Sequence, residues 1–546
     1  MPNRYYNARF TMGYKAETDW GKSDPVLLRG EVVYSVDQEG NVKSKVGNGI
    51  KKWSELPFVT SGGGSSETVN NSKISIEQGN VIKGSFTLNQ SDDQTIVIDD
   101  IPTIAKVYGV GNVGAFYGGA VYDGEYRNSL YRTDNAVGLD YQAVSKQAAD
   151  GSMVTVIESD FDYCYPWSEI TKVIINGNSF IKIPKFYSKI ELDTTSPTSS
   201  EYSLYKYQIS GTKYTGFSTL FTDGHGNEIP YILVGAYEGI GGTESGKSVV
   251  YSKSAGTSES IKIYNNGTDA TNQSNARADC VNWNSIDTTS GNVYHLYDYV
   301  AQNIIEQLFI VEFATTNSQS VMLGATTGSS YNAGATDKIV NSTTDSQAVT
   351  GYLGGAGAGT ACKYRGIENP WGNYWKRVDG IAIAPGYQNK SRFKYSITPE
   401  FYSDIDSYRD EGPATDVEGE GNIVVLGKQS NVQLHNPLLV FPQKIGLASA
   451  GYGAHYYDQF HCVPFTDQPS YFLLGGVYGY GEKAGLFCMY TRFTDYDCAR
   501  LCANAPAEIE STTEDFDIIN CGSSDIASES ADVKSIIACG NSDISD

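Results

Sequence analysis

The sequence predicts a mostly β protein with one α+β region and small β modules at its amino terminus. Three observations support this fold class. The 546 residues include 58 Gly and 40 Tyr, and Tyr is among the residues enriched in strands. Short runs of alternating apolar and polar residues, separated by turn residues, recur along the chain. Only the segment 292–314 carries a long helical pattern.

Residues 1–60 are expected to form a compact β module. Short strands separated by turn residues are predicted in "GEVVYSV", "VKSKVGNGI" and "KKWSELPFV". The small core of this module is expected to consist of Trp53, Leu56, Pro57 and Phe58. The next segment, 61–72, reads "SGGGSSETVNNS", and its Gly and Ser content predicts a flexible linker.

A second, shorter β segment is predicted at 73–102. Within it, "GSFTLNQSDDQTIVIDD" alternates apolar and polar residues as a half-buried strand does. The segment is too short to build a core of its own. We therefore expect it to associate with identical strands from other chains.

The region 103–506 has no clear internal linker and is expected to consist mainly of strands. An Asn-Gly turn in "KVIINGNSFIKIPKFYSKI" predicts a hairpin, and "YILVGAY" predicts a short buried strand. The segment 292–314 is predicted to be a helix whose tyrosines serve packing. Its apolar stripe is formed by Leu296, Val300, Ile304, Leu308 and Val311.

The carboxy-terminal residues 507–546 are acidic and contain an 18-residue repeat. "IINCGSSDI" at 518–526 returns as "IIACGNSDI" at 536–544. Two copies are too few for a solenoid. Strand–turn pairs that stack between chains and a partly ordered tail are both compatible with the pattern.

Charge and composition exclude several classes of protein. The formal charge of −23, from 40 basic and 63 acidic residues, argues against nucleic-acid binding, which needs a basic stripe. The chain has no apolar run of ~18 residues to span a membrane. Its first residues lack the apolar core of a signal peptide. We therefore expect no membrane insertion and no export by that route.

Motifs for metal binding and catalysis are missing. The nine cysteines show no zinc-type spacing and are expected to be mostly buried free thiols. None of the five histidines lies in a hydrolase or metalloprotease motif. His455 and His461 lack a third ligand at a characteristic spacing, so we expect no metal and no cofactor.

Two further segments contain residues that could carry chemistry. The Gly-rich stretch 352–361 lacks the Lys-Ser/Thr ending of a phosphate loop and is expected to be a surface loop. Carboxylates gather near Arg409 in 404–412. A glycosidase draws its carboxylate pair from distant segments, so the sequence leaves that possibility open.

Several stretches together resemble a known family. "YRGIENPWGNYWKRVDGI", at 364–381, is similar to the Glu-Asn-x-x-Gly-Asn-x-Trp block of the C-type-lectin-like fold shared with formylglycine-generating enzymes. The most similar version occurs in phage tail receptor-binding proteins and in the variable proteins of diversity-generating retroelements. Further blocks follow in the family's order at 120–139, 161–190, 216–238, 307–324 and 473–503.

The flanking segments resemble parts of phage tails. "LLRGEVVYSVD" and "VGNGIKKWSELPFV" are similar to modules that open tail fibre and baseplate proteins. "GSFTLNQSDDQTI" resembles short trimeric fibre segments, and the 507–546 repeat resembles Gly-rich β repeats that trail such fibres. The resemblance implies a homotrimeric, non-enzymatic adhesin on the virion, at the tail tip or tail fibre. It would join other tail proteins through its amino terminus and bind a host-surface glycan or protein.

The resemblance also assigns roles to residues. The 364–381 block would be scaffold, with both tryptophans buried and both asparagines satisfying turn backbone. Its scaffold residues are Glu368, Asn369, Trp371, Gly372, Asn373, Trp375, Asp379 and Gly380. In the variable relatives, exposed residues between a Gly-Gly and an Ala-Arg-Leu sequence contact the ligand. The corresponding residues here are Tyr478, Tyr480, Glu482, Tyr490, Arg492, Phe493, Asp495, Tyr496 and Asp497.

The chain departs from the family pattern in places. Lys376 and Arg377 replace an acidic and aromatic pair, so different local partners are expected. Cys498 and Cys502 lie near the reactive cysteines of the enzyme relatives, but their spacing fits the binding branch. Three alternatives to the adhesin are a tail-borne glycan depolymerase, an oxidase of the formylglycine type and a purely structural baseplate protein.

Overall fold

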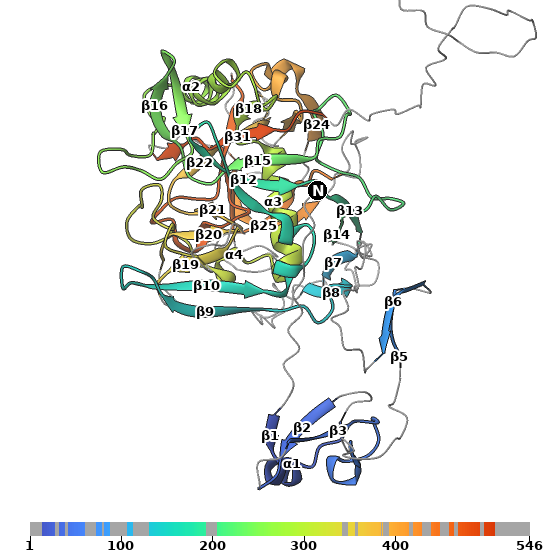
Figure 1. The fold of residues 1–546 in the computed structure, drawn as a ribbon. Helices are drawn as coiled ribbons and strands as arrows, with labels where there is room; N and C mark the ends of the chain where they lie inside the picture. The colour runs from blue at the N-terminus through green and yellow to red at the C-terminus, as the bar shows by residue number, and fades with distance from the viewer. Residues whose placement is uncertain are drawn as a thin grey trace, which may run out of the picture. The chain divides into compact units, whose positions relative to one another are not determined.

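In the computed structural model the chain divides into two compact units, 1–102 and 103–546, which are described separately (Figure 1). The structure describes residues 14–27, 32–38, 42–59, 73–78, 81–87, 106–112, 130–192, 205–340, 348–354, 359–383, 385, 392–413, 419–427, 438–447, 458–462, 468–491 and 496–507. The predicted linker and nearly all of the predicted carboxy-terminal repeat lie outside these ranges.

The first unit contains a four-stranded sheet packed against a short helix. The strands, in spatial order, are β1 (Tyr14–Ala16), β2 (Val32–Val36), β3 (Val42–Val46) and β4 (Phe58–Val59). The helix α1 (Glu17–Ser23) and the 3₁₀ turn η1 (Trp53–Glu55) cover one face. The sequence pattern does not indicate α1, because a seven-residue helix is too short to show an apolar stripe.

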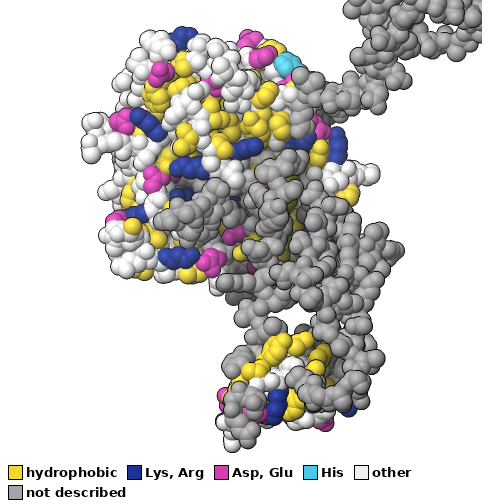
Figure 2. Space-filling view, viewed as in Figure 1, with side chains coloured by type: hydrophobic (Ala, Val, Ile, Leu, Met, Phe, Trp, Pro, Cys, Tyr) yellow, Lys and Arg dark blue, Asp and Glu magenta, His cyan; other side chains and the backbone are white. Residues whose placement is uncertain are grey.

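The core of this unit matches the predicted one in part. Trp53 and Leu56 are buried, with Phe58 packed against them. The rings of Trp20 and Trp53 stack with centroids 6.3 Å apart. Pro57, predicted to join the core, is exposed, because it lies between inward-facing Leu56 and the last strand. Hydrophobic side chains also reach the surface of this unit (Figure 2).

A two-stranded ribbon follows in the same unit. It is formed by β5 (Lys73–Gln78) and β6 (Val81–Thr87), which pair antiparallel with a register shift between Ile76 and Glu77. The predicted alternating strand at 84–100 therefore overlaps β6, and its remainder lies outside the described residues.

The second unit is built from several small, mainly antiparallel sheets, which confirms the prediction of a mostly β fold. One sheet has the order β11 (Thr171–Ile175), β12 (Asn178–Pro184), β15 (Tyr231–Gly235), β31 (Leu501–Asn504) and β18 (Val293–Leu296). A second has the order β21 (Ile367–Glu368), β20 (Cys362–Tyr364), β19 (Thr350–Leu353), β10 (Met153–Ser159) and β9 (Tyr141–Gln147). A third has the order β13 (Tyr187–Leu192), β14 (Tyr205–Ser210), β7 (Val107–Asn112) and β8 (Leu130–Asp134).

The largest sheet carries residues 375–381, the last part of the 364–381 block, on one of its strands. Its order is β24 (Arg409–Pro413), β23 (Arg392–Tyr395), β22 (Trp375–Ile383), β28 (Ser470–Leu474), β29 (Met489–Tyr490), β27 (Gln459–Cys462), β25 (Gly419–Gly427) and β26 (Phe441–Leu447). The short strand β30 (Asp497–Cys498) also pairs with β22, in parallel. A separate ribbon joins β16 (Ile240–Glu244) to β17 (Lys247–Tyr251), and the helices are α2 (Asp269–Val281), α3 (Tyr299–Phe313) and α4 (Ser318–Val321).

Two local predictions in this unit are confirmed. Asn176 and Gly177 form the predicted hairpin turn between β11 and β12, with φ values of 48° and 75°. These left-handed values are what a two-residue hairpin turn requires. The predicted short strand in "YILVGAY" is β15, which is almost fully buried between β12 and β31.

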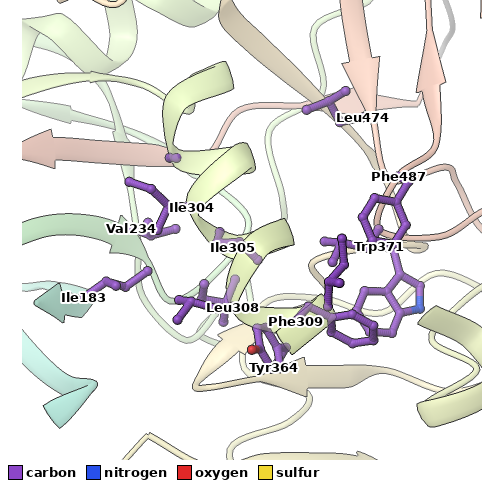
Figure 3. Close-up of a cluster of buried hydrophobic side chains, with 14 of the residues drawn as sticks. Ile183, Val234, Ile304, Ile305, Leu308, Phe309, Tyr364, Trp371, Leu474 and Phe487 are labelled. Atoms are coloured by element: carbon purple, nitrogen blue, oxygen red, sulfur yellow. The ribbon is translucent and has the colours of Figure 1, made fainter. Parts of the chain in front are cut away.

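The long helix is shorter than predicted and is buried on all sides. Residues 293–296 form β18, paired with β31, and the helix α3 begins only after Asp298, whose side chain accepts a hydrogen bond from the Ala301 N–H at 2.7 Å. Fourteen of its fifteen residues are buried. Figure 3 shows Leu308 on the side of Ile183, while Phe309 packs near Trp371, with ring centroids 5.7 Å apart.

In the parts of the chain that the structure describes, none of the helices combines the length and the apolar character needed to span a bilayer.

Candidate ligand-binding surface

The 364–381 block forms a buried frame. All nine residues of β22 are buried, and so are Glu368 and Trp371, which precede it in the sequence. The turn before β22 needs left-handed backbone. Asn369 and Asn373 have φ values of 44° and 62°. Gly372 has φ 72°, and a Cβ placed there would lie 2.7 Å from the Ala325 carbonyl oxygen, which explains the glycine.

Both asparagine side chains form hydrogen bonds with backbone groups, although these groups lie outside their own turn. The Asn373 amide donates to the Tyr331 carbonyl at 3.0 Å, and its oxygen accepts from the Tyr331 N–H at 2.6 Å. The Asn369 oxygen accepts from the Cys362 N–H at 3.2 Å. Both amides also donate to Glu238, which lies between β15 and β16. The two side chains thus tie the turn to three other segments.

Lys376 and Arg377, where the chain departs from the family pattern, are buried and paired with acids. The Lys376 ammonium lies 3.3 Å from a Glu238 carboxylate oxygen and donates to the Gly372 carbonyl at 2.5 Å. Burial lowers the pKa of Lys376, and the Glu238 charge opposes that shift. The different partners expected for these two positions are therefore supplied from inside the fold.

The Arg377 guanidinium is held between two carboxylates. It lies 2.9 Å from Asp269, the first residue of α2, and pairs with Asp497 on β30. Asp497 was predicted to lie on the exposed contact surface, and that prediction is wrong. The residue is fully buried because its carboxylate turns inward to Arg377 while its neighbour Tyr496 turns outward.

Two more acidic residues of the block complete the frame. The Asp379 carboxylate accepts hydrogen bonds from Nε and Nη2 of Arg277 on α2, at 2.9 Å and 2.6 Å, which docks α2 onto β22. Glu368 accepts from the Thr336 N–H at 2.8 Å and from the Gly334 N–H at 2.9 Å. Burial raises the pKa of Glu368 to about 7. The block is therefore scaffold held by buried polar contacts.

Three tyrosines lie together at the surface above this frame, and we call them the tyrosine edge: Tyr374, Tyr478 and Tyr496. The rings of Tyr478 and Tyr496 meet edge to face with centroids 5.4 Å apart, and those of Tyr374 and Tyr478 at 6.1 Å. Tyr496 is 47% exposed, and the other two are partly exposed.

The frame holds this edge in place. The Tyr478 N–H donates to the Asn373 carbonyl at 3.0 Å, and the Tyr374 hydroxyl donates to Ser330 at 3.1 Å. Tyr374 was not among the predicted contact residues. No motif in the sequence marks it; it is partly exposed because it lies in the bend directly before the buried strand β22.

The other predicted contact residues fall into three groups. Tyr480 and Tyr490 are partly buried and pack on Trp375, with ring centroids 5.2 Å and 5.1 Å away. Glu482 is exposed in the 3₁₀ turn η8 (Gly481–Lys483). Arg492, Phe493 and Asp495 lie outside the described residues. Leu486 and Phe487, which lie between these residues in the sequence, are buried.

The thiols of the described residues are not placed for surface chemistry. All seven cysteines in this part of the chain are free and buried, as predicted. Burial raises the pKa of both Cys498 and Cys502, which makes the reactive thiolate harder to form. These two positions therefore do not provide the exposed, activated pair that an oxidase of the formylglycine type would use.

The described ranges include the carboxylates near Arg409 and one of the two candidate metal-binding histidines, His461. No group of three potential metal ligands occurs within them, and His455 lies outside them. The Asp404 carboxylate, near Arg409, accepts from the Asp406 N–H at 3.1 Å and from the Ser407 hydroxyl at 2.5 Å, so it stabilises its own turn.

Two carboxyl groups also lie deep in the core of the second unit. Glu306 on α3 and Asp458 before β27 are both buried, and each lacks a hydrogen-bond partner on one oxygen. Burial raises the pKa of Glu306 to about 8 and that of Asp458 well above its usual range. Because both groups are covered, they are not positioned to attack an external glycan.

Comparison of the chain with protein-family models and with curated proteins finds no match in either set.

Proposed function

We propose that the chain is a phage tail receptor-binding protein, an adhesin that holds a virion to its host cell through the tyrosine edge of a C-type-lectin-like unit. The observation that carries this proposal is the combination of partly exposed tyrosines with a buried, charge-paired frame directly beneath them. Tyrosine offers a large contact area at a low cost in conformational entropy. A surface whose backbone is already fixed loses less entropy when a ligand binds.

The predicted contact residues that lie outside the described ranges are of types that suit an interface. Residues 492–495 contain Arg492, Phe493 and Asp495 and lead directly to Tyr496. Arg and aromatic residues are common among those that dominate binding energy at interfaces. The ligand would be a glycan or a protein of the host surface, and binding requires no reaction.

Three copies of the chain would act together. We propose a homotrimer assembled through the first ~100 residues and attached there to other tail proteins. Linked binding sites raise overall avidity well above that of each site without new contacts. A modest affinity at each tyrosine edge would then hold a virion.

The test is a binding screen with the full-length chain. Fluorescently labelled protein is added to a panel of bacterial strains, and bound fluorescence and released oligosaccharides are both measured. We expect saturable binding to some strains without any release of sugar. Absence of binding to every strain would contradict the proposal, and release of oligosaccharides would replace it with the depolymerase.

A further inference from the structure

A short loop lies beside the tyrosine edge, although it comes from a much earlier part of the chain. The loop, residues 326–332, reads "TTGSSYN". The Ser330 hydroxyl accepts a hydrogen bond from the Tyr374 hydroxyl at 3.1 Å. The Thr326 carbonyl accepts another from the Gly481 N–H at 2.9 Å. The 326–332 loop therefore contacts both a member of the tyrosine edge and the turn that follows Tyr478.

The middle of the 326–332 loop is open to solvent. Its exposed residues are Thr327, Gly328, Ser329 and Asn332, and its partly exposed ones are Ser330 and Tyr331. A Cβ built on Gly328 would meet nothing within 4 Å among the described residues. The turn is thus uncovered at this point and can be reached by another molecule.

Hydrogen bonds fix the backbone of the loop. The buried side chain of Asn373 bonds both the N–H and the carbonyl of Tyr331, at 2.6 Å and 3.0 Å. The Asn332 amide donates to the Glu259 carbonyl at 2.7 Å, and its oxygen accepts from the Ile261 N–H at 3.2 Å. A loop held in this way loses less conformational entropy when a ligand covers it.

The residue types of the loop are those of protein-binding loops. None of its seven residues is charged. The loops through which antibodies contact antigens are enriched in Tyr, Ser, Gly and Asn, since Tyr supplies rigid contact area and the others adapt their hydrogen bonds. Ser, Gly and Asn are also frequent in ordinary turns. This turn differs in its fixed backbone and in its contact with Tyr374, which joins it to a cluster of three partly exposed tyrosines.

We propose that the 326–332 loop is a second contact segment for the host receptor and that this receptor is a protein. The inference rests on the proposed function, because it extends the surface that the tyrosine edge begins. That surface then draws on four separate parts of the chain: 326–332, Tyr374, 478–482 and Tyr496. A standard protein interface involves about 20–30 residues on each side, whereas a small ligand is mostly enclosed in a concave pocket. A surface spread over four segments therefore suits a protein.

The test measures binding of full-length variants to cells of a strain that the wild type binds. Ser329→Arg places a long side chain on an exposed residue of the loop, where it would hold a receptor away. Tyr331→Ala removes a partly exposed aromatic group. We expect each change to weaken binding about 10-fold or more, as loss of an interface anchor does.

The matched control is Thr288→Arg, which adds the same side chain to an exposed residue between the 3₁₀ turn η5 (Asn282–Ser285) and β18. It should bind like wild type. Guanidinium denaturation of the same samples separates lost contact from lost stability. Asn373 bonds the backbone of Tyr331, so Tyr331→Ala keeps these hydrogen bonds. If it unfolds nevertheless, Ser329→Arg decides the outcome.

Two results would overturn the role of the loop. One is wild-type binding by the folded Ser329→Arg and Tyr331→Ala variants. The other is a Thr288→Arg control that loses as much binding as Ser329→Arg.

Treatment of the cells tests the kind of receptor. We expect protease treatment to abolish binding of the wild-type protein, and periodate oxidation of surface sugars to leave it unchanged. Loss of binding after periodate, with binding retained after protease, would overturn the protein receptor and identify a glycan.

Failure of this inference and failure of the proposed function give different results. A wild type that binds no strain refutes the adhesin. If the wild type binds and Tyr478→Ala and Tyr496→Ala weaken that binding, the adhesin stands. Normal binding by both loop variants on the same cells then refutes the second contact segment alone.

Discussion

Replacing Lys376 with methionine tests whether the buried charges under the tyrosine edge hold the second unit together. Methionine fills a similar volume without the ammonium group. The Lys376 and Glu238 side chains are both shielded from solvent, and their charged atoms are 3.3 Å apart. The substitution leaves the Glu238 carboxylate buried with the neutral amides of Asn369 and Asn373 as its remaining partners.

The expected loss of stability is large. Removing one partner of a buried ion pair costs about 3–5 kcal/mol, because the remaining charge is uncompensated. The hydrogen bond from Lys376 to the Gly372 carbonyl adds about 1 kcal/mol. We therefore expect Lys376→Met to lower the free energy of unfolding by about 4–6 kcal/mol. Lys376→Met/Glu238→Gln removes both charges and should recover at least half of that loss.

The assay is guanidinium denaturation of the full chain, followed by tryptophan fluorescence. Four of the six tryptophans lie in the second unit: Trp167, Trp283, Trp371 and Trp375. The transition that these residues report should move in Lys376→Met and return part of the way in the double variant. A loss below about 1 kcal/mol in the single variant would refute the reasoning. A Lys376→Met/Glu238→Gln variant whose loss equals the summed losses of Lys376→Met and Glu238→Gln, each measured alone, would refute it too.

Two other predictions concern the core. The folded-state pKa of Glu306 is raised to about 8 from 4.5, so the folded chain keeps a proton that the unfolded chain loses between these values. The free energy of unfolding should therefore fall as pH rises from 4.5 to 8, by up to about 5 kcal/mol. Glu306→Gln should flatten this slope in denaturation curves at pH 5, 7 and 8.5, and an unchanged slope would contradict the assignment. Because the seven described cysteines are buried, a Cys521→Ser/Cys539→Ser variant should react with a thiol reagent only after denaturant is added; rapid labelling of the native protein would show that one of them is accessible.

Local features of the fold could be read from the sequence. The Asn176-Gly177 turn follows from two residues whose backbone preferences define a hairpin. The burial of Trp371 and Trp375 and that of the described cysteines follow from residue type and from the resemblance of the block. Such features depend on neighbours in the chain, which the sequence shows directly.

Features that depend on distant partners could not be predicted. Leu296 lies in β18 rather than in α3, because it pairs with Leu501 of β31. That partner is far away in the sequence, so the neighbours of Leu296 in the chain do not reveal the pairing. The carboxylates that pair with Arg377 come from α2 and β30, and Asp269 is 108 residues away. The same distant pairing buries Asp497, which the resemblance to the variable proteins had predicted to be exposed.

The most direct test of the central claim measures cell binding by tyrosine variants of the full chain on a strain that the wild type binds. We predict that Tyr496→Ala and Tyr478→Ala each weaken binding about 10-fold or more, as loss of an aromatic anchor does. Tyr163→Ala removes a tyrosine that is 90% exposed elsewhere on the same unit and should bind like wild type. Equal binding by all three variants and wild type would contradict the claim that the tyrosine edge meets the receptor.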